Sequence, residues 1–74
     1  MVLVYTTPNC PYCRMVKDFL RKRKIPFREL DVTKNKSWAN EMIRKSGQTG
    51  VPVTDINGKI VLGFDRAKLE KLLK

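Results

Sequence analysis

Residues 2–13 read VLVYTTPNCPYC, and this stretch sets the beginning of the fold. Residues 2–6 are almost all β-branched, aliphatic or aromatic, which predicts a buried strand of a sheet covered on both faces. Residues 7–9 break the strand. Pro11 suits the first turn of a helix, where its missing N–H costs nothing. The stretch therefore predicts a strand, a short turn, and a helix that starts beside two cysteines.

The next part of the chain continues this alternation. Apolar residues recur at helical spacing to about residue 24, and Pro26 ends the helix. Residues 27–32 alternate in polarity and predict a second, more exposed strand. A right-handed crossover through the helix makes the two strands parallel. Ser37 is the expected N-cap of a second helix, and Gly47 is its expected stop.

The last third of the chain predicts a hairpin followed by a helix. Asn57-Gly58 stands between the apolar runs 51–56 and 59–62, and this pair favours a type I′ turn. Asp65 is the expected cap of the final helix. The order β-α-β-α-β-β-α predicts an α/β fold with a mixed sheet. Asp31 and Asp55 are expected near strand ends, without a partner for acid–base chemistry.

Size and composition indicate one domain, residues 1–74, with a single core. Sixteen Lys and Arg against seven Asp and Glu give a net charge of +9, which favours encounter with acidic proteins or anionic small molecules. Specific nucleic-acid binding is not expected, because charge alone gives non-specific affinity. Neither a membrane span nor a signal peptide is recognised. We expect a cytoplasmic monomer.

Cys10 and Cys13 are the only cysteines of the chain. In a reducing compartment, such a close pair is more typical of catalysis or metal binding than of a permanent bridge. At a helix N-terminus, backbone N–H groups and the helix dipole stabilise a Cys10 thiolate, and Arg14 and Lys17 add positive charge nearby. A thiolate is the attacking species in thiol–disulfide exchange. The pattern predicts that Cys10 attacks a substrate disulfide and that Cys13 resolves the mixed disulfide.

Other roles for the cysteine pair are less well supported. A structural zinc site needs four Cys or His ligands, and this chain has two Cys and no His. Zinc would therefore need a dimer that shares two such pairs, or carboxylate ligands. The alternative function is a binding module in which a dimer shares a metal ion or an iron–sulfur cluster through Cys10. A static disulfide would close too short a loop to constrain the unfolded chain much. The absence of His excludes Cys–His hydrolytic catalysis.

With these residues in view, the sequence resembles the glutaredoxin family of the thioredoxin superfamily. The strand, the CPYC motif at residues 10–13 and the helix that follows resemble the glutaredoxin active site. TGVP at residues 49–52 resembles the segment that carries the family's cis-proline, and GFD at residues 63–65 resembles the turn before its last helix. The resemblance covers nearly the whole chain and is strongest to the short glutaredoxin-like proteins of bacteria and archaea.

This resemblance implies a four-stranded mixed sheet flanked by three helices, with a cis peptide before Pro52 packed against the cysteine pair. It also implies a set of substrate-binding or glutathione-binding residues: Tyr12, Val51, Pro52, Gly63, Phe64 and Asp65. No bound cofactor and no metal are expected. The implied partners are disulfide-containing proteins and, as reductant, glutathione or a thioredoxin-reductase-type flavoenzyme.

Four positions depart from the family pattern, one of them Leu62, which replaces the first glycine of the family's Gly-Gly turn. Thr7 stands three residues before Cys10, where glutathione-using relatives commonly carry a Lys or Arg that binds a glutathione carboxylate. Gly50 replaces the usual Thr before Val-Pro, and Arg66 replaces the second acid of an Asp-Asp pair. The sequence therefore leaves both electron donors open.

Overall fold

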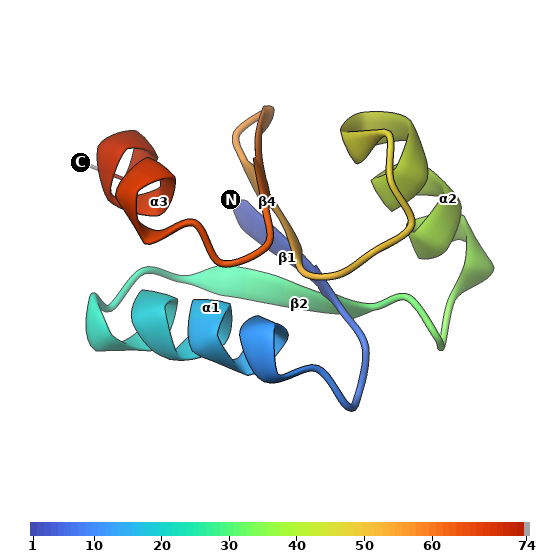
Figure 1. Ribbon diagram of the computed structural model, residues 1–74, viewed down its shortest axis with the longest axis horizontal. Helices are drawn as coiled ribbons and strands as arrows, with labels where there is room; N and C mark the ends of the chain where they lie inside the picture. Colours follow the sequence, from blue (N-terminus) through green and yellow to red (C-terminus); the bar gives the residue numbers. More distant parts are fainter. Residues whose placement is uncertain (74) are drawn as a thin grey trace.

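The computed structural model describes residues 1–73 (Figure 1). The elements follow the predicted order: β1 (Val2–Thr6), α1 (Pro11–Lys22), β2 (Phe27–Asp31), α2 (Lys36–Ser46), β3 (Val53–Ile56), β4 (Lys59–Leu62) and α3 (Arg66–Leu72). None of the helices in the described part of the chain is long and apolar enough to cross a bilayer.

The four strands form one mixed sheet in the order β2-β1-β3-β4. β1 pairs with β2 in parallel, whereas the β1–β3 and β3–β4 pairs are antiparallel. Asn57 and Gly58 in the β3–β4 turn have φ angles of 52° and 95°, as a type I′ turn requires. β1 is therefore a central, mostly buried strand, and the predicted fold class is confirmed.

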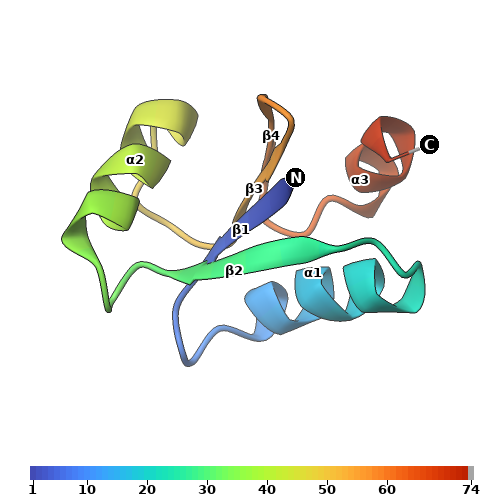
Figure 2. The ribbon, with the colours of Figure 1, turned by 180° about the vertical axis from the view of Figure 1, so that it is seen from behind.

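Helices cover both faces of this sheet, and each face has its own core (Figures 1 and 2). The face under α1 and α3 buries Val2, Val4, Val16, Phe19, Leu20, Ile56, Val61 and Leu69. The face under α2 buries Tyr5, Leu30, Met42 and Val53. Because successive side chains of a strand point to opposite faces, β1 contributes to both cores.

The start of α2 differs from the prediction. Asn35, not Ser37, is the N-cap, and its Oδ1 accepts the N–H groups of Ser37 at 2.9 Å and Trp38 at 3.4 Å. The Ser37 hydroxyl donates to the same oxygen at 2.6 Å. Both residue types are good caps, and the extended backbone of Asn35, with φ of −148° and ψ of 111°, places its side chain to cap the helix. The helix ends at Gly47, with φ of 74°, as predicted.

Two further elements, β3 and α1, are shorter than predicted. β3 begins at Val53 instead of Val51, because Pro52 has no N–H to donate to a strand ladder. α1 ends at Lys22 instead of residue 24, and Lys24 adopts a left-handed φ of 55°. Asp65 caps α3 as expected, with its Oδ1 accepting the Lys68 N–H at 3.1 Å.

Candidate active site

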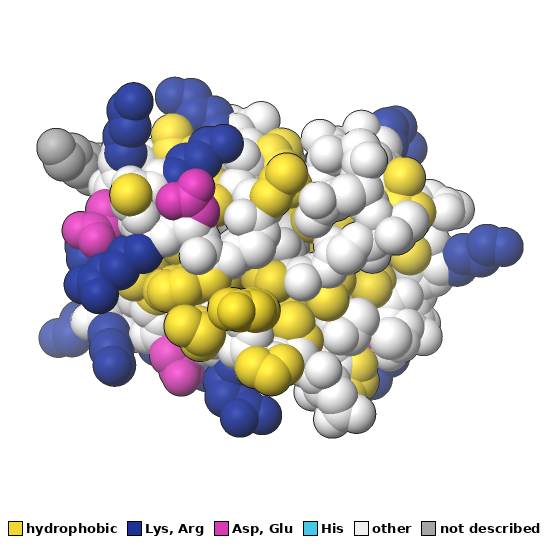
Figure 3. All heavy atoms as spheres, in the orientation of Figure 1, with side chains coloured by type: hydrophobic (Ala, Val, Ile, Leu, Met, Phe, Trp, Pro, Cys, Tyr) yellow, Lys and Arg dark blue, Asp and Glu magenta, His cyan; other side chains and the backbone are white. Residues whose placement is uncertain are grey.

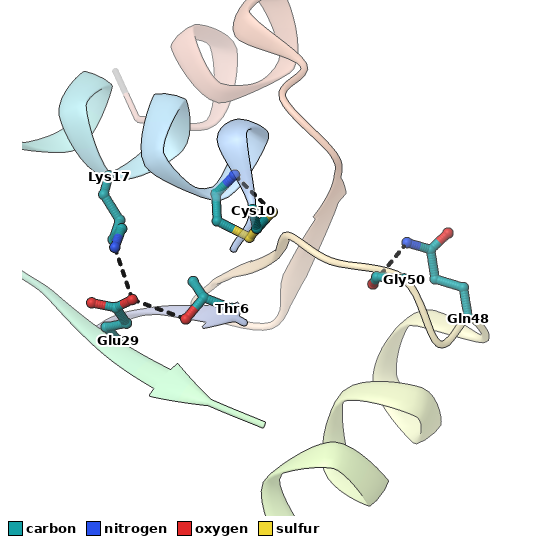
Figure 4. Close-up of a disulfide and its surroundings, with 7 residues drawn as sticks. Thr6, Cys10, Lys17, Glu29, Gln48 and Gly50 are labelled. Carbon is teal, nitrogen blue, oxygen red and sulfur yellow. Dashed lines mark hydrogen bonds and ion pairs between the residues drawn. A yellow bond between two sulfur atoms is a disulfide. The ribbon is translucent and has the colours of Figure 1, made fainter. Parts of the chain in front are cut away.

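Cys10 and Cys13 lie at the start of α1 and are joined by a disulfide (Figure 4). Cys10 is the N-cap of the helix, and its Sγ accepts the backbone N–H of Cys13 at 3.1 Å. Sulfur thus takes the place that a Ser or Asp oxygen occupies in other caps. The N–H group and the helix dipole that stabilise a thiolate are consequently already directed at Cys10.

The two sulfur-bearing residues differ in their access to solvent. Cys13 is 1% exposed, covered in the first turn of α1, whereas Cys10 is half-buried. Tyr12, between them, is 61% exposed and projects from the surface. An incoming molecule therefore meets Cys10 and Tyr12 first.

A short chain of polar side chains lies next to the start of α1 (Figure 4). Glu29 Oε2 on β2 accepts from Lys17 Nζ at 2.9 Å and from the Thr6 hydroxyl at 2.9 Å. The hydrogen bond from Lys17 holds the pKa of the Glu29 carboxyl below its ordinary value, against partial burial and with help from Thr6. The positive charge that the sequence assigned to the thiolate from Lys17 is thus compensated by Glu29, while Arg14 remains exposed.

The Val51–Pro52 peptide is cis, as the resemblance implied. Pro52 is fully buried, and its carbonyl accepts the Gly63 N–H at 3.0 Å. This bond ties the segment before β3 to the turn before α3. Val51 is half-buried, and neither its N–H nor its carbonyl has a backbone partner within residues 1–73. A free backbone edge of this kind is suited to an added extended strand.

The turn before α3 brings the remaining sequence-predicted residues together. Gly63 has a φ of 65°, which favours glycine. Phe64 packs edge-to-face on Phe19 of α1, with ring centroids 6.2 Å apart. Asp65 is exposed and caps α3. Phe64 therefore lies against the middle of α1, whereas Gly63 is held at Pro52.

The opposite face of the sheet holds a network of charges that sequence reasoning missed. The hydroxyl of buried Tyr5 donates to Glu41 Oε2 at 2.8 Å, and Lys45 Nζ donates to the Tyr5 oxygen at 2.8 Å. Lys45 Nζ also donates to Asp55 Oδ2 at 2.7 Å, and Asp55 Oδ1 accepts the Gly58 N–H at 2.7 Å. Asp55 is thus a buried, paired carboxylate near the end of β3, as predicted, but its partner Lys45 was not predicted from the sequence.

This network shifts several pKa values. Burial alone would raise the pKa of Asp55, but the hydrogen bonds from Lys45 and Gly58 outweigh it and the pKa is lowered. Burial alone would lower the pKa of Lys45, but its bonds to Asp55 and Tyr5 raise it. Burial raises the pKa of Tyr5. Lys45 and Asp55 therefore stay charged near neutral pH, which does not suit either of them to proton transfer there.

A mixed four-stranded sheet, a Cys-x-x-Cys disulfide at a helix N-terminus and a cis-proline define a class: dithiol proteins with the thioredoxin fold. The sequence model of the glutaredoxin family matches residues 2–61. A glutaredoxin-like 8.6 kDa protein from the rubredoxin operon of Clostridium pasteurianum is 38% identical over 100% of this chain and 99% of its own. Glutaredoxin 3 of Escherichia coli is 36% identical over 99% of this chain and 96% of its own.

The solved structure of a glutaredoxin from Archaeoglobus fulgidus superposes with a TM-score of 0.91 at 29% identity, over 99% of this chain and 85% of that one. The chain belongs to the glutaredoxin family, and it is a thiol–disulfide oxidoreductase.

Proposed function

We propose that the protein reduces disulfides of other proteins by a two-cysteine cycle. In the reduced protein, the Cys10 thiolate attacks one sulfur of a substrate disulfide and displaces the other as a thiolate, which takes up a proton. Cys13 then loses its proton and attacks Cys10 Sγ. The second substrate sulfur is displaced as a thiolate and takes up a proton. The substrate thus gains two electrons from the cysteine pair, and the protein is left oxidised, with a Cys10–Cys13 disulfide.

The observation that carries this assignment is the asymmetry of the two cysteines. Cys10 is accessible and receives the Cys13 N–H, whereas Cys13 is 1% exposed. A bulky substrate disulfide reaches Cys10 and not Cys13. Cys13 needs to reach only Cys10, which lies 5.2 Å away between Cα atoms. We therefore assign the attack to the more accessible Cys10 and the resolving step to the covered Cys13.

We assign the substrate-binding role to the six residues that the family resemblance implied. They are Tyr12, Val51, Pro52, Gly63, Phe64 and Asp65. The unpaired backbone groups of Val51 support pairing with an extended substrate segment. Exposed Tyr12 offers an apolar ring with a polar end, as interface tyrosines commonly do.

For the electron donor, we infer a thioredoxin-reductase-type flavoenzyme in preference to glutathione. Thr7 supplies no charge for a glutathione carboxylate. Lys17, four residues after Cys13 on α1, already forms an ion pair with Glu29. A coupled assay with NADPH tests this choice in two arms, one with glutathione and its reductase, the other with a thioredoxin reductase. We expect turnover in the second arm. Turnover confined to the glutathione arm would overturn this inference and leave the two-cysteine cycle intact.

Single-cysteine variants test the cycle itself. Cys10→Ser is expected to abolish reduction of a protein disulfide such as that of insulin, because no accessible thiolate remains. Cys13→Ser is expected to stop at the mixed disulfide, which mass spectrometry detects as a covalent adduct on Cys10. Persistent turnover in Cys10→Ser would contradict the assignment of roles.

The alternative of a metal-binding dimer has its own measurement. Within residues 1–73, no group of three or more His, Cys, Asp or Glu side chains is placed to hold a metal ion, so such a site needs a second copy. Metal content, visible absorption and oligomeric state of the purified protein separate the two functions. For the oxidoreductase we propose a colourless, metal-free monomer acting in the cytoplasm.

A further inference from the structure

A groove of about 480 Å³ lies between α1 and the start of α3, and neither cysteine lines it. Its apolar lining is made by Met15, Phe19 and Phe64. Met15 is 43% exposed although it belongs to the apolar stripe of α1. Tyr12, one turn earlier on the same helix, extends this apolar surface towards Cys10. The space-filling view shows apolar side chains gathered between α1 and the segment that leads to α3 (Figure 3).

The lining of the groove is firmly held. Phe19 and Phe64 pack edge-to-face, and the Arg23 guanidinium lies 4.4 Å from the centroid of the Phe19 ring. Arg23 is in turn paired with Glu70 of α3 at 3.4 Å. α1 and α3 are thereby linked at the far end of the groove. An apolar side chain that enters meets a preformed surface, which lowers the ordering cost of binding.

The rim of the groove is positively charged. Lys22, Arg23 and Arg66 line it together with one carboxylate, Asp18. Arg23 and Arg66 share the single carboxylate of Glu70, and Lys22 has no ion pair within the described residues 1–73. The rim therefore keeps an excess of positive charge, which attracts carboxylates on an incoming chain.

We propose that this groove binds the polypeptide substrate, by taking one apolar side chain that is flanked by carboxylates. The proposal rests on the proposed function, because it assigns a substrate class to the same redox site. The apolar ring of Phe19 lies nine residues after Cys10, which is about 13 Å along a helix. An extended chain covers about 3.3 Å per residue. The apolar substrate side chain that fills the groove, which we call the anchor, therefore lies about four residues from the substrate's reacting cysteine.

The distance of about 13 Å from Cys10 to Phe19 distinguishes protein substrates from glutathione, because only a longer chain spans it. Glutathione has one residue on either side of its cysteine and does not extend to the groove. The groove therefore increases the rate with longer chains only, and it selects among them by the charge around the anchor.

Synthetic peptides test the proposal. Each peptide carries one cysteine, is linked to a second copy by a disulfide, and has a Leu between two Glu residues four positions from the cysteine. Comparison peptides replace Leu by Ser, replace both Glu by Lys, or place the anchor next to the cysteine. The pre-reduced protein is mixed with each peptide in a single turnover, and thiol formation is followed after acid quenching. We expect the anchor peptide to react about fivefold faster than each of the others, because each of them loses the apolar contact, the two exposed charge pairs, or the spacing that allows both.

Two variants with a matched control link this preference to the groove. Lys22→Glu is expected to lower the rate ratio between the Glu-flanked and Lys-flanked peptides by about fivefold. Met15→Ser is expected to reduce the ratio between the Leu and Ser peptides. Lys59→Glu makes the same charge change beside the β3–β4 turn, at the far end of the sheet, and is expected to leave both ratios unchanged.

Hydroxyethyl disulfide distinguishes failure of the groove from failure of the redox cycle. If the protein reduces this small disulfide and all peptides at similar rates, the groove proposal is overturned and the redox function stands. If it reduces none of them, the proposed function fails first. An equal effect of Lys22→Glu and Lys59→Glu would assign the preference to net charge and would also overturn the groove.

Discussion

The two faces of the sheet bury different chemistry although they share β1. Val4 points into the apolar core under α1 and α3, and its neighbour Tyr5 points into the charged network under α2. The α1/α3 face carries the disulfide and the groove, with reactive and apolar groups near the surface. The α2 face carries the paired charges of Glu41, Lys45 and Asp55. We infer that substitutions under α2 change stability, and that substitutions on the α1 surface change turnover.

Breaking the α2 network is expected to have the largest effect on stability. Lys45→Met leaves Asp55 and the Tyr5 hydroxyl buried without their cation. We expect a loss of about 3 kcal/mol in the free energy of unfolding, as for other broken buried pairs. Denaturant unfolding with the disulfide intact measures it.

Lys59→Met is the matched control, because Lys59 is exposed on β4. Its expected change is below about 0.5 kcal/mol. The comparison between the faces would break if Lys45→Met kept full stability, or if it lost disulfide reduction while still folded.

The contribution of the α2 network to the free energy of unfolding is also expected to depend on pH. The pKa of Asp55 in the folded protein lies below its ordinary value of 3.8, because the bonds from Lys45 and Gly58 outweigh the effect of burial. Its stabilising contribution is therefore complete above 3.8 and is lost as pH falls through the lower, folded value. Unfolding free energy should decline steeply below about pH 4.

Asp55→Asn separates this contribution from those of other carboxylates. Glu29 and Asp31 also have lowered pKa values, from the bonds of Lys17 and Thr33 respectively, and remain in the variant. The variant is expected to start less stable and to lose less on acidification. Parallel pH curves for the two proteins would show that Asp55 is not the titrating group.

Thr54 offers a smaller, stabilising change within the same strand. Its hydroxyl is buried and has no hydrogen-bond partner among the described residues. Thr54→Val keeps the branched shape and removes the unsatisfied group, so we expect a gain of about 1 kcal/mol. Thermal and denaturant unfolding measure it. A loss of stability would mean that the hydroxyl does have a partner in solution.

The smallest effect on stability is expected on the surface of α1. Tyr12→Ala removes a 61% exposed ring, so the unfolding free energy should change by less than about 0.5 kcal/mol. Reduction of insulin should nevertheless slow relative to reduction of hydroxyethyl disulfide. Ile43→Ala, at an exposed position of α2, is the control and should alter neither rate. Equal slowing of both substrates by Tyr12→Ala would place its role in chemistry and not in binding.

Much of this arrangement was predictable because it depends on local signals. Alternating polarity, Pro26, Gly47 and the Asn57-Gly58 turn each act within a few residues and predicted the order of elements. The cap of α2 was misplaced because Asn35 and Ser37 offer equivalent oxygen acceptors, and only the backbone geometry chooses between them.

The charged network was not predictable from local signals. Glu41 and Lys45 are four residues apart on α2 and look like an exposed helical ion pair. Asp55 precedes a turn, where carboxylates are common. Only the packing of α2 against β1 and β3 brings these three together around Tyr5. The ion pair between Lys17 and Glu29 was not predicted for the same reason, because it joins a helix to a strand.

The unequal exposure of the two cysteines has a kinetic consequence. In the proposed cycle, every reductant that enters and every substrate that leaves passes through Cys10, because Cys13 is covered. The reductant reacts with the oxidised protein and the substrate with the reduced protein, both at Cys10, so the steady-state kinetics are ping-pong. A substrate and a donor of similar shape each bind, at high concentration, to the redox form of the protein that reacts with the other. Each is then a competitive inhibitor of the other.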